Sequence, residues 1–98
     1  MDISWDLYKY FYFVCEFKNL TKVANYFCVT QPAITKKIKL LEDQLSEKLV
    51  ISSNKGIKMT DAGQELYESI KPAVEIFINA EELFDISSEK GKKNIKVS

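Results

Sequence analysis

The chain has 98 residues, 46% of them hydrophobic and 12% aromatic, which predicts one small folded domain rather than a disordered segment. It has no histidine and two cysteines, Cys15 and Cys28, without CxxC spacing, so the sequence offers no plausible zinc site. No apolar run is long enough to span a membrane. The cysteines are expected to be small buried side chains in a reducing cytoplasm.

The charges balance to zero over the whole chain, but they are unevenly distributed. Residues 1–59 carry nine lysines and six acids, a net +3, and residues 60–98 carry five lysines and eight acids, a net −3. All fourteen basic residues are lysine, which binds phosphate as a point charge and lacks the planar fork with which arginine reads guanine. The N-terminal part is therefore the part suited to an anionic partner.

Two helices are predicted at the start of the chain. Residues 4–18 form the first, capped by Ser4, and residues 20–27 form the second, capped by Asn19. The dense aromatic residues of the first helix could stack on bases, but their helical spacing favours core packing. Tyr8 lies off the main stripe, as does Tyr12, and both are expected to meet a neighbouring element or a second subunit. The apolar stripes consist of Leu7, Phe11, Val14, Cys15, Leu20, Val23, Ala24 and Phe27.

The stretch 29–45 predicts a helix with one apolar and one lysine-rich face. Thr30 is its expected N-cap, and Pro32 lies in the first turn, where a missing N–H costs nothing. Its first turns offer amide, hydroxyl and ammonium groups, which suit a DNA major groove, although a merely solvated amphipathic helix has the same pattern. With the short helix before it, this segment predicts a helix-turn-helix. The apolar stripe consists of Ile34, Ile38, Leu41 and Leu45.

A β-prone run at residues 49–52, a turn cluster and an alternating run at residues 57–60 predict a hairpin with Lys55 at its tip. A hairpin after a helix-turn-helix makes a winged helix, whose tip can reach a phosphate or the minor groove. Glu42 and Asp43 are expected on the surface of the preceding helix, pairing with lysines there. The chain also lacks catalytic histidines and a glycine-rich phosphate loop, so it is not expected to be an enzyme.

A long helix is predicted over residues 61–86, capped by Thr60. A helix of roughly 25 residues is almost 40 Å long, more than a small domain covers, so part of its apolar seam is expected to pair with a second copy. The alternative is packing along its own domain. Pro72 lies off the seam and is expected to kink the helix. The seam consists of Leu66, Ile70, Ala73, Phe77, Ala80 and Phe84.

The elements and several residues resemble the N-terminal winged helix-turn-helix domain of LysR-type transcriptional regulators. This resemblance implies a mainly α fold, with a DNA-binding domain at residues 1–60 and a linker and dimerisation helix at residues 61–86. Residues 87–98 would be a hinge and the start of an effector-binding domain, or else a disordered tail. The matching residues are Leu7, Phe11, Val14, Ala24, Thr-Gln-Pro-Ala-Ile-Thr at 30–35, Ile38, Leu41, Glu42, Leu45, Leu49 and Thr-Asp-Ala-Gly at 60–63.

The resemblance also implies a homodimer on double-stranded DNA, no cofactor in this chain, and a small-molecule effector bound by the domain beyond it. The Gln31 amide suits adenine and Thr35 suits a thymine methyl, so without arginine an A·T-rich site is predicted. The resemblance places Thr30, Gln31, Pro32, Thr35, Lys36 and Lys55 at the DNA, and Lys39 and Lys58 are expected to add phosphate contacts.

Three residues depart from the usual pattern of that family. The family usually has Gly where this chain has Ser46, Phe where it has Val50 and Arg where it has Ser52. Without the arginine, the contribution of the wing would rest on Lys55 and Lys58. Two other functions stay open from the sequence. One is a winged-helix dimerisation or protein-interaction module with weak DNA binding. The other is a related winged-helix regulator, such as the molybdate-responsive type.

Overall fold

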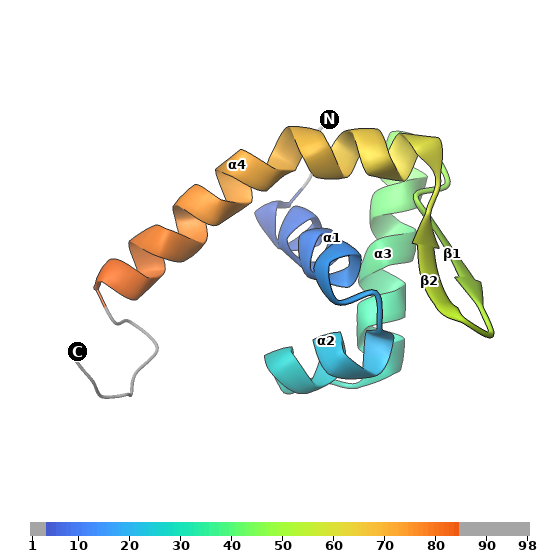
Figure 1. Cartoon of the computed structure of the whole chain (residues 1–98), viewed down its shortest axis with the longest axis horizontal. Helices are drawn as coiled ribbons and strands as arrows, with labels where there is room; N and C mark the ends of the chain where they lie inside the picture. The colour runs from blue at the N-terminus through green and yellow to red at the C-terminus, as the bar shows by residue number, and fades with distance from the viewer. Residues whose placement is uncertain (1–3, 85–98) are drawn as a thin grey trace.

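The computed structural model describes residues 4–84, which form a winged helix-turn-helix followed by a long helix (Figure 1). This confirms the mainly helical fold predicted from the sequence. The hinge and start of an effector-binding domain expected at residues 87–98 lie outside the described residues. The elements are α1 (Trp5–Phe17), α2 (Leu20–Phe27), α3 (Gln31–Leu45), β1 (Val50–Ser53), β2 (Gly56–Met59) and α4 (Asp61–Leu83).

All four helices begin at a polar residue whose side chain accepts a hydrogen bond from a backbone N–H, as predicted. The caps are Ser4, Asn19, Thr30 and Thr60. The first three helices end at residues in the left-handed conformation, with φ of 54° at Lys18, 60° at Cys28 and 57° at Ser46. A side chain with a Cβ is disfavoured there by about 1–2 kcal/mol, so the ends of these helices are strained.

The two cysteines lie in different surroundings. Cys15 is 3% exposed in the core, as predicted, and burial raises the pKa of its thiol to about 12. Cys28 is exposed, so the expectation that it is buried is wrong. The cause is its backbone: Cys28 is the left-handed cap of α2, and the chain turns outward there before α3 begins.

The core forms where α1 contacts α2, α3 and α4, with α4 crossing over α1 (Figure 1). Tyr12 donates a hydrogen bond from its hydroxyl to Glu75 Oε2 at 3.1 Å, and Tyr67 donates one to Glu16. Because each bond runs from one helix to the other, the pair fixes α4 across α1. Tyr12 thus meets a neighbouring element, as expected. The largest fully buried side chains are Phe11, Val14, Val23, Ile34, Leu41, Leu49 and Val74.

The hairpin has the predicted tip. β1 and β2 pair antiparallel, with Ser53 opposite Gly56, so Lys55 lies in the connecting turn. Gly56 has a φ of 115°, which glycine adopts far more readily than other residues. Beyond the hairpin, Gly63 lies in the first turn of α4, where an added Cβ would come within 2.0 Å of the Leu49 carbonyl oxygen. The hairpin base and α4 are therefore in direct backbone contact.

α4 stays continuous through Pro72 and bends along its length (Figure 1). The heptad seam predicted for it is split between the core and solvent. Ile70 packs against the core of its own domain together with Leu66, and Val74, which the heptad pattern left out, is fully buried. This occurs because the stripe of α4 that faces α1 is rotated from the seam by part of a turn.

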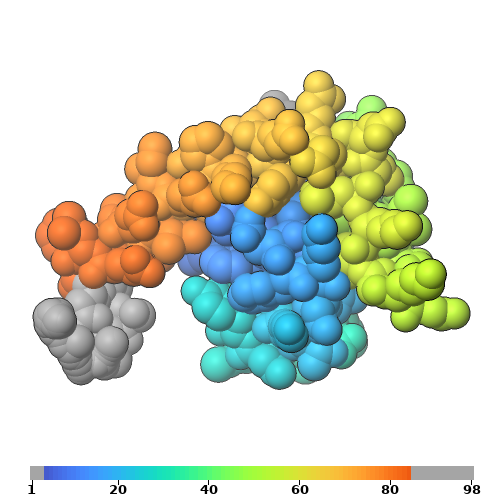
Figure 2. Space-filling view, viewed as in Figure 1, coloured from blue at the N-terminus to red at the C-terminus, as the bar shows by residue number. Residues whose placement is uncertain are grey.

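The C-terminal half of α4 extends beyond the other helices as an arm (Figure 2). Ile76 is 67% exposed and Leu83 is 77% exposed, although neither belongs to the predicted seam. Phe77 is 53% exposed while its ring centroid lies 4.6 Å from that of Trp5. We call the exposed apolar side chains of this half the arm surface, which consists of Ala73, Ile76, Phe77, Ala80, Leu83 and Phe84.

Candidate nucleic-acid interface

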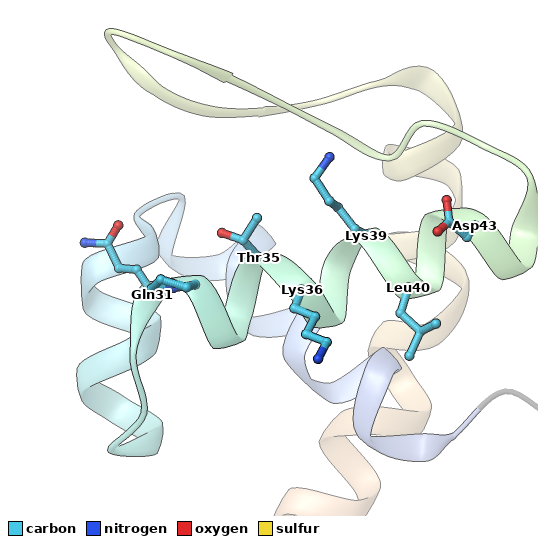
Figure 3. A pocket seen from close by; sticks show the side chains of 7 residues that line it. Gln31, Thr35, Lys36, Lys39, Leu40 and Asp43 are labelled. Carbon is cyan, nitrogen blue, oxygen red and sulfur yellow. The ribbon is translucent and has the colours of Figure 1, made fainter.

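One face of α3 brings five of the predicted site residues together along a groove (Figure 3). In this view Lys39 points toward the hairpin and Lys36 points away from it. The N-terminal part of this face carries amide, hydroxyl and ammonium groups, and its one acid, Asp43, lies near the C-terminal end of α3. The groove is lined by Gln31, Pro32, Thr35, Lys36, Lys39, Leu40 and Asp43.

Gln31 is positioned by α2. Its Nε2 donates a hydrogen bond to Thr21 Oγ1 at 2.5 Å, a contact that the sequence analysis did not predict. An amide nitrogen has two hydrogens, so one N–H donor and the Oε1 acceptor remain available to a partner. Thr30 caps α3 by accepting the Ala33 N–H at 3.3 Å, and its own O–H remains a donor. Both side chains are exposed.

The wing residues form a second part of the surface. Lys55 and Lys58 are exposed and lie outside the groove of α3. Ser53 and Asn54 line a second hollow together with Gln31, so the side of the wing lies close to the start of α3. Ser52, where the resembling family usually has arginine, lines the same hollow. No motif in the sequence marked this junction, because it depends on how the hairpin folds back.

The interface lysines differ from lysines elsewhere on the chain. Lys37 Nζ lies 5.8 Å from the ring centroid of Tyr10, and Lys9 Nζ lies 3.8 Å from Glu81 Oε1. These ammonium groups therefore interact with their own domain. Lys36 and Lys39, by contrast, are exposed on the groove of α3.

Glu42 does not lie where the sequence predicted. It was expected on the helix surface beside Lys39, but it is 9% exposed, and its Oε2 accepts hydrogen bonds from the backbone N–H groups of Leu49 and Val50. The chain folds back after α3 and presents these N–H groups to it. Lys48 Nζ lies 4.0 Å from Glu42 Oε1. Asp43 is exposed, as expected.

Other kinds of site are not evident in the part of the chain that the structure describes. No group of three or more histidine, cysteine, aspartate or glutamate side chains there is arranged to hold a metal ion. Within residues 4–84, no helix combines the length and apolar character needed to cross a membrane.

The sequence of the domain matches known regulators. Residues 5–64 match the model of the lysR family of bacterial regulatory helix-turn-helix proteins. The nitrogen assimilation regulatory protein nac of Escherichia coli (strain K12) is 36% identical over 59 residues, which cover 60% of this chain and 19% of that protein. This chain thus spans about a fifth of the length of that relative.

Solved structures agree with this match. Vibrio fischeri DarR in complex with DNA is 28% identical, with a TM-score of 0.72 over 89% of this chain and 30% of that chain. The BenM DBD in complex with catB site 1 DNA is 25% identical, with a TM-score of 0.69 over 87% of this chain and 92% of that chain. The second comparison covers almost all of a separate DNA-binding domain, so the whole described fold has a counterpart there.

The family match extends from the first residue of α1 into the first turn of α4, which is more than half of the chain. It confirms the resemblance drawn from the sequence. The family consists of transcriptional regulators, so the prediction that the chain is not an enzyme is also confirmed. The chain belongs to the LysR family of bacterial transcriptional regulators and contains the DNA-binding winged helix-turn-helix domain of that family.

Proposed function

We propose that this chain binds DNA as a homodimer, inserts α3 into the major groove, and prefers A·T-rich half-sites. The observation that carries the proposal is the exposed face of α3, where Gln31, Thr35 and Lys36 lie side by side with no acid among them. Such a face combines groups that read base edges with groups that neutralise phosphates.

Gln31 and Thr35 are the proposed base-reading residues. The free N–H and Oε1 of Gln31 match the N7 acceptor and N6 donor of adenine, and the bond that Gln31 donates to Thr21 leaves both available. The Thr35 methyl suits the methyl group of thymine. Because the chain has no arginine to grip guanine bidentately, these contacts favour A·T pairs.

The proposed phosphate contacts come from two elements. Lys36 and Lys39 extend from the groove on α3, while Lys55 and Lys58 extend from the wing (Figure 3). Pro32 is exposed in the first turn of α3 beside the proposed contacts, and Thr30 keeps its O–H free for a phosphate oxygen. Each phosphate contact adds about 0.9 to the slope of log affinity against log salt concentration.

The arm surface is the proposed dimer interface. It leaves Leu83 77% exposed and Phe84 73% exposed, which is unfavourable for apolar side chains of this size in water. A second arm packed against it would bury both. Relative to the heptad seam predicted from the sequence, the proposed interface gains Ile76 and Leu83 and loses Leu66 and Ile70 to the core of the domain.

Two substitutions test the roles on α3. Gln31→Ala should weaken binding by about 1–3 kcal/mol and relax specificity at one base pair, whereas Lys36→Ala should weaken all sequences together. Gln64→Ala and Lys71→Ala on α4 are the matched controls and should leave affinity unchanged. Fluorescence anisotropy with selected and scrambled duplexes at two salt concentrations measures both effects. Equal behaviour of the two α3 variants would show that the division of roles is wrong.

Selection from random duplexes tests the preference for A·T. Enrichment of A·T-rich half-sites supports the proposal, and recovery of G·C-rich half-sites refutes it. The alternative of a protein-interaction module with weak DNA binding, which the zero net charge favours, predicts no salt-dependent binding to any selected duplex.

Sedimentation tests the dimer. Leu83→Glu should convert the protein to monomers, because it would place a charge in the proposed interface. Glu82→Lys is the control, since Glu82 is exposed and no residue of the arm surface lies three or four positions from it along α4. A Leu83→Glu protein that still sediments as a dimer would rule out the arm surface as the interface.

The wider organisation is also part of the proposal. A regulator of bacterial DNA would act in the cytoplasm, and a small-molecule effector would bind outside this chain. The division into residues 1–60, 61–86 and 87–98 stays a prediction. In the structure, α4 ends at Leu83, and its first half packs in the same core as the winged helix.

A further inference from the structure

The wing is connected to α3 through a buried carboxylate. The Glu42 side chain is 10% exposed, and its Oε2 accepts hydrogen bonds from Leu49 N at 2.7 Å and Val50 N at 3.2 Å. Val50 is the first residue of β1, so one side chain on the proposed reading helix binds the backbone where the wing begins. A carboxylate is a stronger acceptor than a neutral group, and here it serves two donors.

The segment before the wing is tied to Glu42 a second time and to α4 as well. The Glu42 carbonyl oxygen accepts a hydrogen bond from Glu47 N at 3.1 Å. On the other side, Thr60 N donates to the Leu49 carbonyl oxygen at 3.0 Å, and Gly63 lies against the same carbonyl group. The backbone at Leu49 is therefore held through its N–H by α3 and through its C=O by the start of α4.

The base of the wing is also packed through the fully buried Leu49 side chain, but β1 itself is packed only in part. A cavity of about 290 Å³ lies between α3 and β1, with Ile38 and Glu42 on one wall and Val50 and Ser52 on the other. The rest of β1, residues 51–53, is exposed. β2 has its own anchor in Ile57, which is buried against the core. Between α3 and β1, the Glu42 carboxylate therefore provides a direct hydrogen-bonded connection at one end of the cavity.

We propose that Glu42 is a positioning residue that sets the place of the wing relative to α3, and thereby brings Lys55 to the DNA. This inference rests on the proposed function for its effect on binding, but its geometric part does not. Loss of the bonds from Leu49 and Val50 would allow β1 to tilt into the cavity, and the turn that joins β1 to β2 would shift with it.

The geometric test measures the distance between nitroxide labels on the wing and on α3, without DNA. Labels at Lys55→Cys and Lys36→Cys are introduced in a Cys28→Ser background, where the remaining Cys15 is buried. We expect one narrow distance in the parent and in Glu42→Gln, whose amide oxygen still accepts, and a shifted, broadened distribution in Glu42→Leu. Glu47→Leu, which removes a neighbouring exposed acid, is the matched control and should match the parent.

A shorter carboxylate gives an independent variant if Glu42→Leu does not fold. Glu42→Asp keeps the charge but shortens the side chain by one methylene, so it should broaden the distance distribution where Glu42→Gln does not. An unchanged distribution in every folded variant that removes or shortens the acceptor overturns the proposal. Broadening in Glu42→Gln equal to that in Glu42→Asp also overturns it, because an acceptor of full reach would then position the wing no better than a shortened one.

The binding test compares two lysines in two backgrounds, with a selected duplex. In the parent protein, Lys55→Ala should lower the salt slope by about 0.9 per wing contact. In the Glu42→Asp background the same substitution should have no effect, whereas Lys36→Ala should keep its full effect. A Lys55→Ala effect in the Glu42→Asp background that is as large as in the parent overturns the proposal. If Lys55→Ala has no effect in either background while the distance still broadens, the wing contact in the proposed function fails and the positioning role of Glu42 stands.

Discussion

Ser46 offers a direct test of the strain at the end of α3. It is the left-handed cap of that helix, with φ of 57° and ψ of 38°, and its N–H donates to the carbonyl oxygens of Glu42 and Asp43. The backbone bonds require this conformation, while the Cβ of serine disfavours it. Ser46→Gly should keep the bonds and remove the strain, which makes it stabilising.

The magnitude follows from two opposing terms. The left-handed conformation disfavours a residue with a Cβ by roughly 1–2 kcal/mol. Glycine loses more backbone entropy on folding, which offsets roughly 0.5–1 kcal/mol of that gain. Because the Ser46 side chain is exposed, little else is lost. The net expectation is a gain of about 0.5–1 kcal/mol in the free energy of unfolding, or a rise of several degrees in Tm for a domain of this size.

Urea unfolding followed by circular dichroism measures the change, at one fixed protein concentration so that association does not alter the comparison. Ser69→Gly is the matched control, because Ser69 is an exposed serine inside α4 with ordinary helical geometry. It should lower stability by about 0.5–1 kcal/mol. Equal destabilisation by both substitutions would refute the reasoning, since it would mean that the conformation of Ser46 costs nothing.

Three further outcomes are expected. Gly63→Ala should destabilise the fold by roughly 3 kcal/mol or more in urea unfolding, because its Cβ would lie 2.0 Å from the Leu49 carbonyl oxygen. A thiol reagent should modify the exposed Cys28 at once and Cys15 only on unfolding, because burial raises the pKa of Cys15 to about 12. Cys28→Ser should abolish the fast phase of modification. Burial and nearby glutamates raise the pKa of Tyr12 to about 12. The stability that the neutral Tyr12 hydroxyl contributes should therefore be complete below about pH 10 and decline toward pH 12. This decline should be smaller in Tyr12→Phe.

The sequence was sufficient to predict features that depend on local chemistry. Capping requires an acceptor side chain beside free N–H groups, so Asn19 and Thr60 marked the starts of helices without further information. The glycine at position 56 and the alternation after it marked the hairpin turn, with Lys55 at its tip. The polar face of α3 was predictable as well, because residues three or four apart in a helix share a face whatever it packs against.

Tertiary structure decided which of several possible partners each side chain has. Glu42 is polar and follows lysines, so its sequence predicts a surface ion pair, but the return of the chain after α3 buries it against two backbone N–H groups. The seam of α4 is apolar over a wide arc, and only the angle at which α4 crosses α1 decides that Ile70 faces the core and Leu83 faces solvent. Local patterns determine the elements and their faces, whereas the contacts between distant segments depend on how these elements are placed in three dimensions.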